Sequence, residues 1–412
     1  MEKRKSICIL ALSPIARDGR VLRQIQYLAP YYDLTVVGYG PAHPDLAHHP
    51  HVAWVEVAPP PGSVESVGTE PKGREDRRQA HLGYTLRRIL FRLALHAGRH
   101  LPAFYNLAYS LRWGYQLALQ GKLARRFDAY HANDWNTLPV AAAAAQRHHA
   151  KLVVDLHEYA PLEFENLRDW WLFEPLIRSV LQRYATGADA LMTVAAVIAE
   201  RYRHELGLDP LVVLNAPEYI SPPLKQLDPH NIRLVHHGVA YQIRKPEVMI
   251  QTIALCESRY TLHFMLVPAP YIEALKKLAA EIAPGRVFFH DAVAPEKIVS
   301  TIAQFDVGFN FIAPTNYNYR VCLPNKFFES LMAGLAICTG PSPSMVEMVE
   351  QYGCGVVAPS FEPQALAAVL NQTSAEQWAV MQQAARAAAK ELNAAHEMQK
   401  VVDLYERLFA EN

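Results

Sequence analysis

The sequence lacks an excess of charge of either sign. Lysine plus arginine and aspartate plus glutamate both number 40 among 412 residues, so the formal net charge is zero. A protein dedicated to DNA or RNA needs surplus positive charge to contact the phosphates. The composition therefore indicates no nucleic-acid partner.

Paired cysteines and long apolar runs are also missing. The five cysteines lie at positions 8, 256, 322, 338 and 354 without a CxxC pair, a pattern typical of buried reduced thiols. The start, MEKRKSICILAL, has an apolar segment too short for a signal peptide. No stretch of about 18 apolar residues is present to span a membrane. We therefore expect a cytoplasmic protein.

Motifs for common cofactors are absent as well. The first predicted β–α loop, SPIARDGRV, lacks the GxGxxG of NAD-binding proteins, and no Walker lysine pattern occurs. There is no DxD in a position that suggests metal binding and no cluster of histidine and cysteine. An NAD-dependent oxidoreductase and a P-loop NTPase are poorly supported, and we expect no metal requirement.

What the sequence does contain is a regular alternation of apolar strands and helices. Helical spacing of apolar residues at 21–29 and an alanine-rich helix from 138 separate apolar segments of strand length. This alternation predicts a doubly wound α/β domain with a buried parallel sheet. Its strands are predicted at 6–12, 33–39, 128–131, 152–156, 190–194 and 211–214.

The alternation restarts after a polar, proline-bearing linker at 222–231. Further strands are predicted from 232 and at 262–268, 286–293, 306–312 and 335–340. We therefore predict two Rossmann-like domains, 1–221 and 230–390, facing each other across a cleft at the carboxyl ends of their strands, where open α/β sheets bind ligands. A long last helix, about 375–408, would cross back, so that 391–412 packs on the N-terminal domain.

Two segments interrupt the first domain. Residues 58–82 are rich in proline, glycine and charge and are predicted to form a mobile loop. Residues 84–126 predict amphipathic helices in which Arg87, Arg88, Arg92 and Arg99 stand beside apolar residues. Such helices can lie on an anionic membrane, here the inner face of the plasma membrane. The alternative is that the apolar stripe packs on the core and the arginines face water.

The stretch RVCLPNKFFESLMAGLAICTG, residues 320–340, carries the most specific chemistry. A helix is predicted from about Leu323 to Gly334, with Pro324 in its first turn, where a missing N–H costs nothing. The helix start and Lys326 suit a phosphate, and Glu329, one turn further, suits the diol of a ribose. The alternative is a capping Asn325, a solvent-facing Lys326 and an ion pair between Lys326 and Glu329.

The same stretch carries a resemblance to a known family. LPNKFFESLMAGLAICTG followed by PSPSMVEMVEQYGCGVV resembles the donor-site signature of the retaining glycosyltransferases of family 4, which have the GT-B architecture. HHGVAYQIRKPEVMIQTIA is similar to the Gly-then-Arg segment of that family, and RDGRVLRQIQYLAPYYDLTVVG and VVDLHEYAP are similar to its N-terminal segments. The resemblance spans nearly the whole chain.

The resemblance implies a metal-independent transfer of a sugar, of the hexosyltransferase type, from a UDP- or GDP-sugar to a glycan or lipid-linked acceptor, with retention. It implies that Glu329 holds the ribose hydroxyls of the donor. Lys326 and Arg244 would neutralise the diphosphate, with Gly238 letting the backbone approach it. The other donor contacts would be Asn318, Tyr319, Pro324 and Asn325.

The N-terminal domain would supply the remaining site residues. His157 and Glu158 would face the reacting sugar, and Asp18 and Arg20 would lie in the first loop near the acceptor. The alternative for His157 is a hydrogen-bonded histidine at the end of a strand, a polar contact and not a base.

The sequence departs from the family pattern at one position. Much of the family has two glutamates separated by seven residues, and Val321 stands where the first should be. In lacking this first glutamate, the sequence resembles a subgroup of the family that carries an LPNK-type motif. Two alternatives stay open: a nucleotide-sugar epimerase of similar fold, and a non-catalytic member that binds a glycan or a partner.

Overall fold

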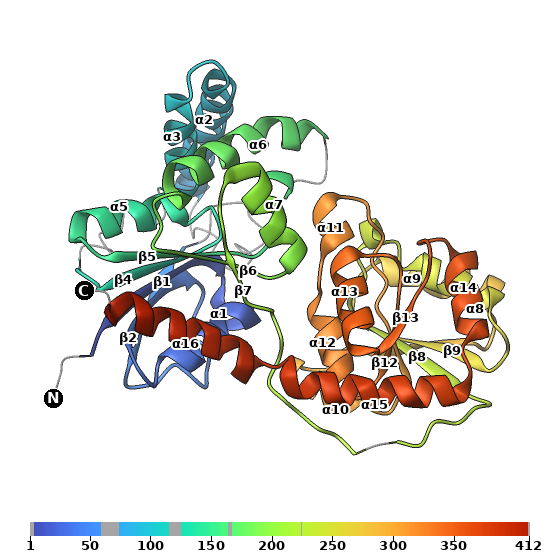
Figure 1. The fold of residues 1–412 in the computed structure, drawn as a ribbon. Helices are drawn as coiled ribbons and strands as arrows, with labels where there is room; N and C mark the ends of the chain where they lie inside the picture. The colour runs from blue at the N-terminus through green and yellow to red at the C-terminus, as the bar shows by residue number, and fades with distance from the viewer. Residues whose placement is uncertain (1–3, 59–73, 115–124, 164–166, 224, 411–412) are drawn as a thin grey trace. The chain divides into compact units, whose positions relative to one another are not determined.

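The computed structural model describes residues 4–58, 74–114, 125–163, 167–223 and 225–410, and it divides into two compact units. Unit 1 comprises 1–194, 198–213 and 398–412, and unit 2 comprises 195–197 and 214–397. Each unit is built around its own parallel sheet (Figure 1). The prediction of two Rossmann-like domains is thereby confirmed.

Unit 1 contains a seven-stranded parallel sheet in the order β3-β2-β1-β4-β5-β6-β7. Strand β1 lies between β2 and β4, so the chain leaves β1 toward one edge and later returns to its other side. Such a reversal is the switch point at which open α/β sheets bind ligands. The strands are β1 (Ser6–Pro14), β2 (Asp33–Tyr39), β3 (Val52–Val57), β4 (Ala129–Asn133), β5 (Lys151–Leu156), β6 (Ala190–Thr193) and β7 (Leu211–Val212).

The helices of unit 1 follow the predicted alternation, with one difference in the predicted mobile loop. The helices are α1 (Gly19–Leu28), α2 (Arg74–Gly98), α3 (Ala103–Tyr109), α5 (Leu138–His148), α6 (Leu167–Val180) and α7 (Ala196–Leu206). Residues 74–82, predicted as part of a mobile loop, belong to α2, because the run REDRRQAH consists mainly of good helix formers. The rest of that loop, residues 59–73, lies outside the described residues, as do residues 115–124 of the predicted insertion.

The C-terminal segment consists of two helices, not the single helix predicted at 375–408. Helix α15 (Ala375–Glu391) ends, and α16 (Ala394–Ala410) begins after Asn393. The side chain of Asn393 accepts a hydrogen bond from the backbone N–H of His396 at 3.2 Å, and asparagine is a strong helix N-cap. Residues 398–408 of α16 share one buried core with β1, β2 and α1 (Figure 1).

Unit 2 contains a six-stranded parallel sheet in the order β10-β9-β8-β11-β12-β13, with a switch point beside β8. Its strands are β8 (Ile232–Val239), β9 (Tyr260–Val267), β10 (Val287–Asp291), β11 (Val307–Phe309), β12 (Ala336–Thr339) and β13 (Gly355–Val357). Its helices are α8 (Glu247–Leu255), α9 (Tyr271–Ile282), α10 (Ile298–Ile302), α11 (Tyr317–Val321), α12 (Asn325–Met332), α13 (Pro343–Tyr352) and α14 (Pro363–Gln372).

Candidate functional site

In unit 1, polar residues gather where β4 and β5 end, beside the switch point. Asn133 is the last residue of β4 and Asp134 follows it; Asp155 lies near the end of β5 and His157 follows that strand. The parallel register pairs Asn133 with Asp155. The carboxyl ends of parallel strands lie at one edge of a sheet, so these four side chains form one cluster.

Asp155 is the buried centre of this cluster. Its carboxylate accepts hydrogen bonds from Nε and Nη2 of Arg20, at 2.6 and 2.7 Å, and from Nε2 of Gln24 at 2.6 Å. Burial alone would raise the pKa of Asp155, but Arg20 and His157 outweigh burial and hold that pKa well below its usual range. The carboxylate is therefore charged at any working pH.

Both ring nitrogens of His157 face oxygen acceptors. Nδ1 lies 3.2 Å from Oδ2 of Asp134, and Nε2 lies 3.1 Å from Oδ1 of Asn133 and 3.5 Å from Oδ2 of Asp155. Burial lowers the pKa of His157, but the two carboxylates outweigh it and raise the pKa to about 9. An imidazolium that donates from both nitrogens satisfies this geometry, which makes His157 a poor general base near pH 7.

Asp18 and Arg20, predicted in the first loop near the acceptor, lie at the start of α1. Arg20 is a residue of α1, and its buried guanidinium also donates to the carbonyl of Val213 at 2.8 Å. Asp18 is the N-cap of α1 and accepts from the N–H of Val21 at 3.2 Å and from Oγ of Ser13 at 2.7 Å. The Arg20 side chain is thus committed to Asp155, because a buried charge needs a fixed partner.

Glu158 follows His157 and is exposed at the same edge. Its backbone carbonyl accepts a hydrogen bond from the hydroxyl of Tyr202 at 2.7 Å, which anchors the turn after β5.

In unit 2, the end of β8 and the start of α12 bring Gly238 and Lys326 together. Gly238 has φ of +113°, a backbone conformation that favours glycine, and a Cβ built on it would lie 3.9 Å from Nζ of Lys326. Lys326 is buried, which contradicts the alternative of a solvent-facing lysine. Nζ of Lys326 lies 3.1 Å from Nε2 of His236. Burial and then the nearby Arg244 lower the pKa of Lys326 to about 7.

Glu329 also faces β8. Its Oε2 accepts a hydrogen bond from Nε2 of His237 at 2.7 Å, so its partner in the structure is a histidine of the sheet, not Lys326 as in the alternative ion pair. The second carboxylate oxygen of Glu329 makes no hydrogen bond that involves another described residue.

Arg244 ends the short helix that follows β8. Its guanidinium lies over the rings of Tyr241 and Tyr319, with centroids at 5.1 and 5.0 Å. Within the described residues, its buried Nε has no hydrogen-bond partner. Arg244, Tyr319 and Lys326 therefore lie together around the carboxyl end of β8.

The other predicted donor residues lie on or beside α11 and α12. Helix α12 begins at Asn325, with Pro324 as its N-cap, so the predicted start near Leu323 is displaced by about half a turn. The first amides of α12 have no preceding turn to bond to, and Pro324 provides no side-chain cap. Oδ1 of the exposed Asn325 accepts from Nδ2 of Asn215 at 2.8 Å. Asn318 is buried.

Val321, at the position of the family's first acid, is 1 % exposed, and its carbonyl accepts from Oγ of Ser344 at 2.6 Å. It is therefore a core residue, and its hydrogen bond with Ser344 joins α11 to α13.

The sequence did not predict the hydrogen-bond and ion-pair partners of the candidate site residues. Asp155, His236 and His237 lie in segments that carry the family resemblance, and Asp134 lies three residues after the predicted strand 128–131. A polar residue in the last positions of a buried apolar strand is the signal that would have found them.

The described part of the chain has no group of three or more His, Cys, Asp or Glu residues placed to hold a metal ion. No helix in the same part combines the length and the apolar character needed to cross a membrane.

Two parallel Rossmann-like units, each with polar residues at its switch point, define a two-domain doubly wound α/β protein. Comparison with protein families is more specific. Residues 32–216 match the glycosyl transferase 4-like domain, and residues 232–375 match the glycosyl transferases group 1. The chain belongs to the GT-B glycosyltransferases. No protein with a curated description matches its sequence.

Solved structures of similar fold cover nearly the whole chain. Anabaena Alr3699/HepE in complex with UDP and glucose is 16% identical, with a TM-score of 0.65, and covers 98% of this chain and 100% of its own. Sucrose-phosphate synthase from Thermosynechococcus elongatus is 13% identical, with a TM-score of 0.71 and coverage of 99% and 100%. WaaG, a glycosyltransferase involved in lipopolysaccharide biosynthesis, is 12% identical, with a TM-score of 0.60 and coverage of 97% and 99%.

Proposed function

We propose that this glycosyltransferase moves a sugar, of hexosyl type, from a nucleoside-diphosphate sugar to a glycan or lipid-linked acceptor in polysaccharide or glycolipid biosynthesis. The observation that carries the proposal is the buried ammonium of Lys326 beside Gly238, with Arg244 close by. A buried ammonium with a second, half-buried cation nearby and, among the described residues, no ion-paired carboxylate is costly unless an anion binds there. The UDP complexes of HepE support a UDP-sugar, and a GDP-sugar is the alternative donor.

Rupture of the bond between the sugar and the diphosphate places negative charge on the departing nucleoside diphosphate. Lys326, Arg244 and the first amides of α12 would stabilise that charge in the transition state, without a metal. The free carboxylate oxygen of Glu329 would accept from a ribose hydroxyl, while Asn318, Tyr319 and Asn325 would line the donor. The family's LPNK-type subgroup would include this chain.

Retention is proposed from the resemblance to the retaining family, and the retaining route that follows requires no protein nucleophile. The acceptor oxygen would attack the anomeric carbon on the face that the diphosphate leaves, and a departing phosphate oxygen would take the acceptor's proton. His157 is compatible with this route, because a ring already protonated at pH 7, with both N–H groups directed at Asp134 and Asn133, does not remove a proton from the acceptor. Glu158 would face the same sugar, and Asp18 the acceptor.

A donor screen tests the proposal. UDP-, GDP- and dTDP-sugars are added to the protein, and one of them is expected to raise the melting temperature. With that donor, release of nucleoside diphosphate should require an acceptor. Isomerisation of the sugar without an acceptor would identify the alternative epimerase, and failure of every donor to bind would favour a non-catalytic member.

An anionic membrane surface is the partner we propose for the insertion. Leu86, Ile89, Leu90 and Leu93 of α2 are exposed large apolar residues at helical spacing i, i+3, i+4 and i+7, so they form one solvent-facing stripe. The opposite face of α2, with Phe91, Ala94 and Leu95, is already buried against the unit. The stripe is therefore a second apolar face, which core packing does not explain.

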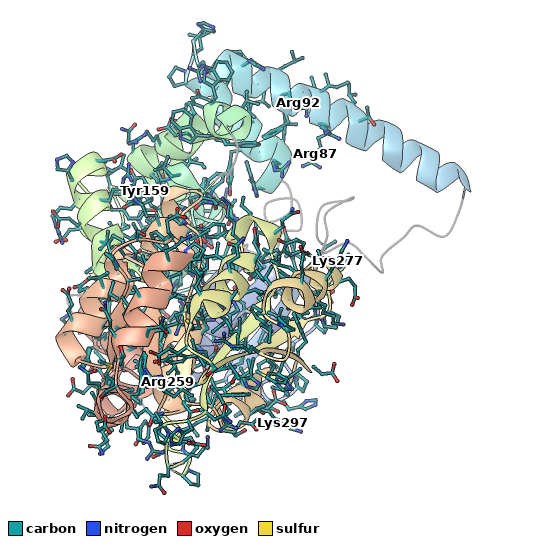
Figure 2. The ribbon with its side chains drawn as sticks, turned by 90° about the vertical axis from the view of Figure 1, so that its right-hand side faces the viewer. Arg87, Arg92, Tyr159, Arg259, Lys277 and Lys297 are labelled. Carbon is teal, nitrogen blue, oxygen red and sulfur yellow. The ribbon has the colours of Figure 1, made fainter. Side chains whose placement is uncertain are left out.

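The stripe continues onto neighbouring elements and is flanked by cations. Exposed apolar side chains follow on α3 and α6, and Arg99 stacks on Trp171 at 3.9 Å from the ring centroid. Arg88 and Arg92 are exposed on α2, and Figure 2 shows Arg87 and Arg92 along that helix. Apolar residues with arginines at their border are typical of a helix that lies in an anionic lipid interface. The exposed apolar side chains that extend the stripe beyond α2 are Leu101, Phe104, Leu107, Trp170 and Trp171.

A further inference from the structure

The hydrogen bonds of His236 define the state of its ring. Nδ1 lies 2.8 Å from the backbone carbonyl of Phe309, and because a carbonyl only accepts, Nδ1 carries the proton. Burial, followed by the positive charge of Lys326, lowers the pKa of His236 well below its usual value, so the ring is neutral. Nε2 then carries a lone pair, with which it accepts a hydrogen bond from Nζ of Lys326 at 3.1 Å.

Lys326 depends on this single acceptor among the described side chains. The ionisable groups that influence it are Arg244, which disfavours its charge, and Cys322 and Glu329, which favour it weakly. Glu329 is hydrogen-bonded to His237 and does not form an ion pair with the lysine. The ammonium is therefore held beside Gly238 by a neutral ring, and no carboxylate within the described residues forms an ion pair with it.

We propose that His236 is a positioning residue for the donor diphosphate: its Nε2 holds the amino group of Lys326 beside Gly238, ready to bind the anion. The inference rests on the proposed function, since it assigns to the diphosphate the place next to Lys326. A carboxylate in place of His236 would neutralise the lysine before the donor arrives. A neutral acceptor orients the amino group and leaves its charge for the ligand.

Proton uptake on binding follows from this arrangement. Lys326 has a pKa near 7 in the free protein, and a neighbouring diphosphate raises that pKa. At pH 8 most free molecules hold a neutral lysine and most complexes hold an ammonium, so binding takes up close to one proton. At pH 6 the lysine is already charged and binding takes up almost none. Affinity therefore falls as the pH rises from 6 to 8.

The experiment uses UDP-glucose and GDP-mannose as probes of the full chain at pH 6 and pH 8. Dissociation constants and proton uptake are measured by calorimetry in buffers of different ionisation enthalpy. His236→Asn keeps a donor for Phe309 where Nδ1 stood but removes the acceptor at Nε2. His236→Gln places an acceptor near Nε2. His263→Asn, on β9 and hydrogen-bonded to His290, is the matched control.

We expect the wild type to take up close to one proton at pH 8. His236→Asn should weaken binding about tenfold or more at pH 8 and less at pH 6, whereas His236→Gln should stay within about threefold of wild type, as should His263→Asn. Equal losses in the Asn and Gln variants at both pH values, or wild-type affinity and proton uptake in His236→Asn, would overturn the positioning role. If neither probe binds the wild type, the proposed function fails and this inference falls with it.

Discussion

The guanidinium of Arg20 and the carboxylate of Asp155 form a two-pronged, buried ion pair, with N–O distances of 2.6 and 2.7 Å. The pair joins α1 to the end of β5, directly beside His157. Arg20 therefore acts through Asp155 on the histidine. The sequence predicted Arg20 in the first loop near the acceptor, whereas the structure places it in α1 with its side chain buried against Asp155.

Replacement of Arg20 by methionine is expected to destabilise unit 1 by about 3–5 kcal/mol, because it removes the guanidinium that forms two hydrogen bonds with the buried carboxylate of Asp155. The double variant Arg20→Met, Asp155→Asn should regain much of that loss. Denaturant unfolding monitored by tryptophan fluorescence measures it. Arg203→Met, which removes an exposed ion pair with Asp209, is the control and should leave the unfolding midpoint unchanged. A single Arg20 variant as stable as the control would contradict the account.

His157 should titrate near pH 9, and Asp134→Asn should lower that pKa, because Asp134 is the largest favourable charge on the ring. The folded-state pKa lies above the unfolded value of about 6.5, so the stabilisation is fully present below pH 6.5 and is lost as the pH rises through 9. Carbon-13 histidine NMR, assigned with His157→Gln, gives the pKa. Titration at or below pH 6.5 would show that the two carboxylates do not hold the imidazolium.

Sugar transfer is expected to persist in excess EDTA, since Lys326, Arg244 and the start of α12 supply the positive charge that a metal would otherwise provide. The measurement is the initial rate of transfer with the donor found in the screen. Loss of activity on chelation, with recovery on adding magnesium, would contradict the metal-independent mechanism. It would not contradict the assignment of the donor-binding residues.

The insertion should bind vesicles through its exposed stripe. Leu86→Ser combined with Leu93→Ser is expected to reduce flotation with anionic vesicles at least tenfold, because both leucines are 59% exposed and would enter the lipid. Val380→Ser, a change of an exposed apolar residue on α15, is the control. Equal flotation of the double variant and the control, or equal binding of the wild type to neutral and anionic vesicles, would contradict the membrane role.

The sequence predicted the strands better than the contacts between their ends. Long apolar segments such as β1 and β2 were found within a few residues, because burial on both faces requires uninterrupted apolar residues. Edge strands β3 and β13 were missed, since β3 is only partly buried and β13 has three residues. The break at Asn393 was also missed, because helical spacing continues across it.

For the candidate site, too, the sequence indicated residues but not the contacts between them. The resemblance identified Lys326, Glu329, Arg244 and Gly238, and the structure gathers them around the end of β8. Their hydrogen-bond partners could not be predicted from the sequence, because strand register and loop geometry determine which histidine contacts Lys326. Burial was equally invisible: Lys326 reads as a surface lysine in sequence and is covered in the fold.

The central claim is that Lys326 and Glu329 bind the donor. Calorimetric titration with the nucleotide sugar selected by the screen, for wild type, Lys326→Ala and Glu329→Ala, tests it most directly, with circular dichroism to verify the fold. We predict that both variants keep the wild-type spectrum and bind at least tenfold more weakly. Wild-type affinity in both folded variants would contradict the assignment.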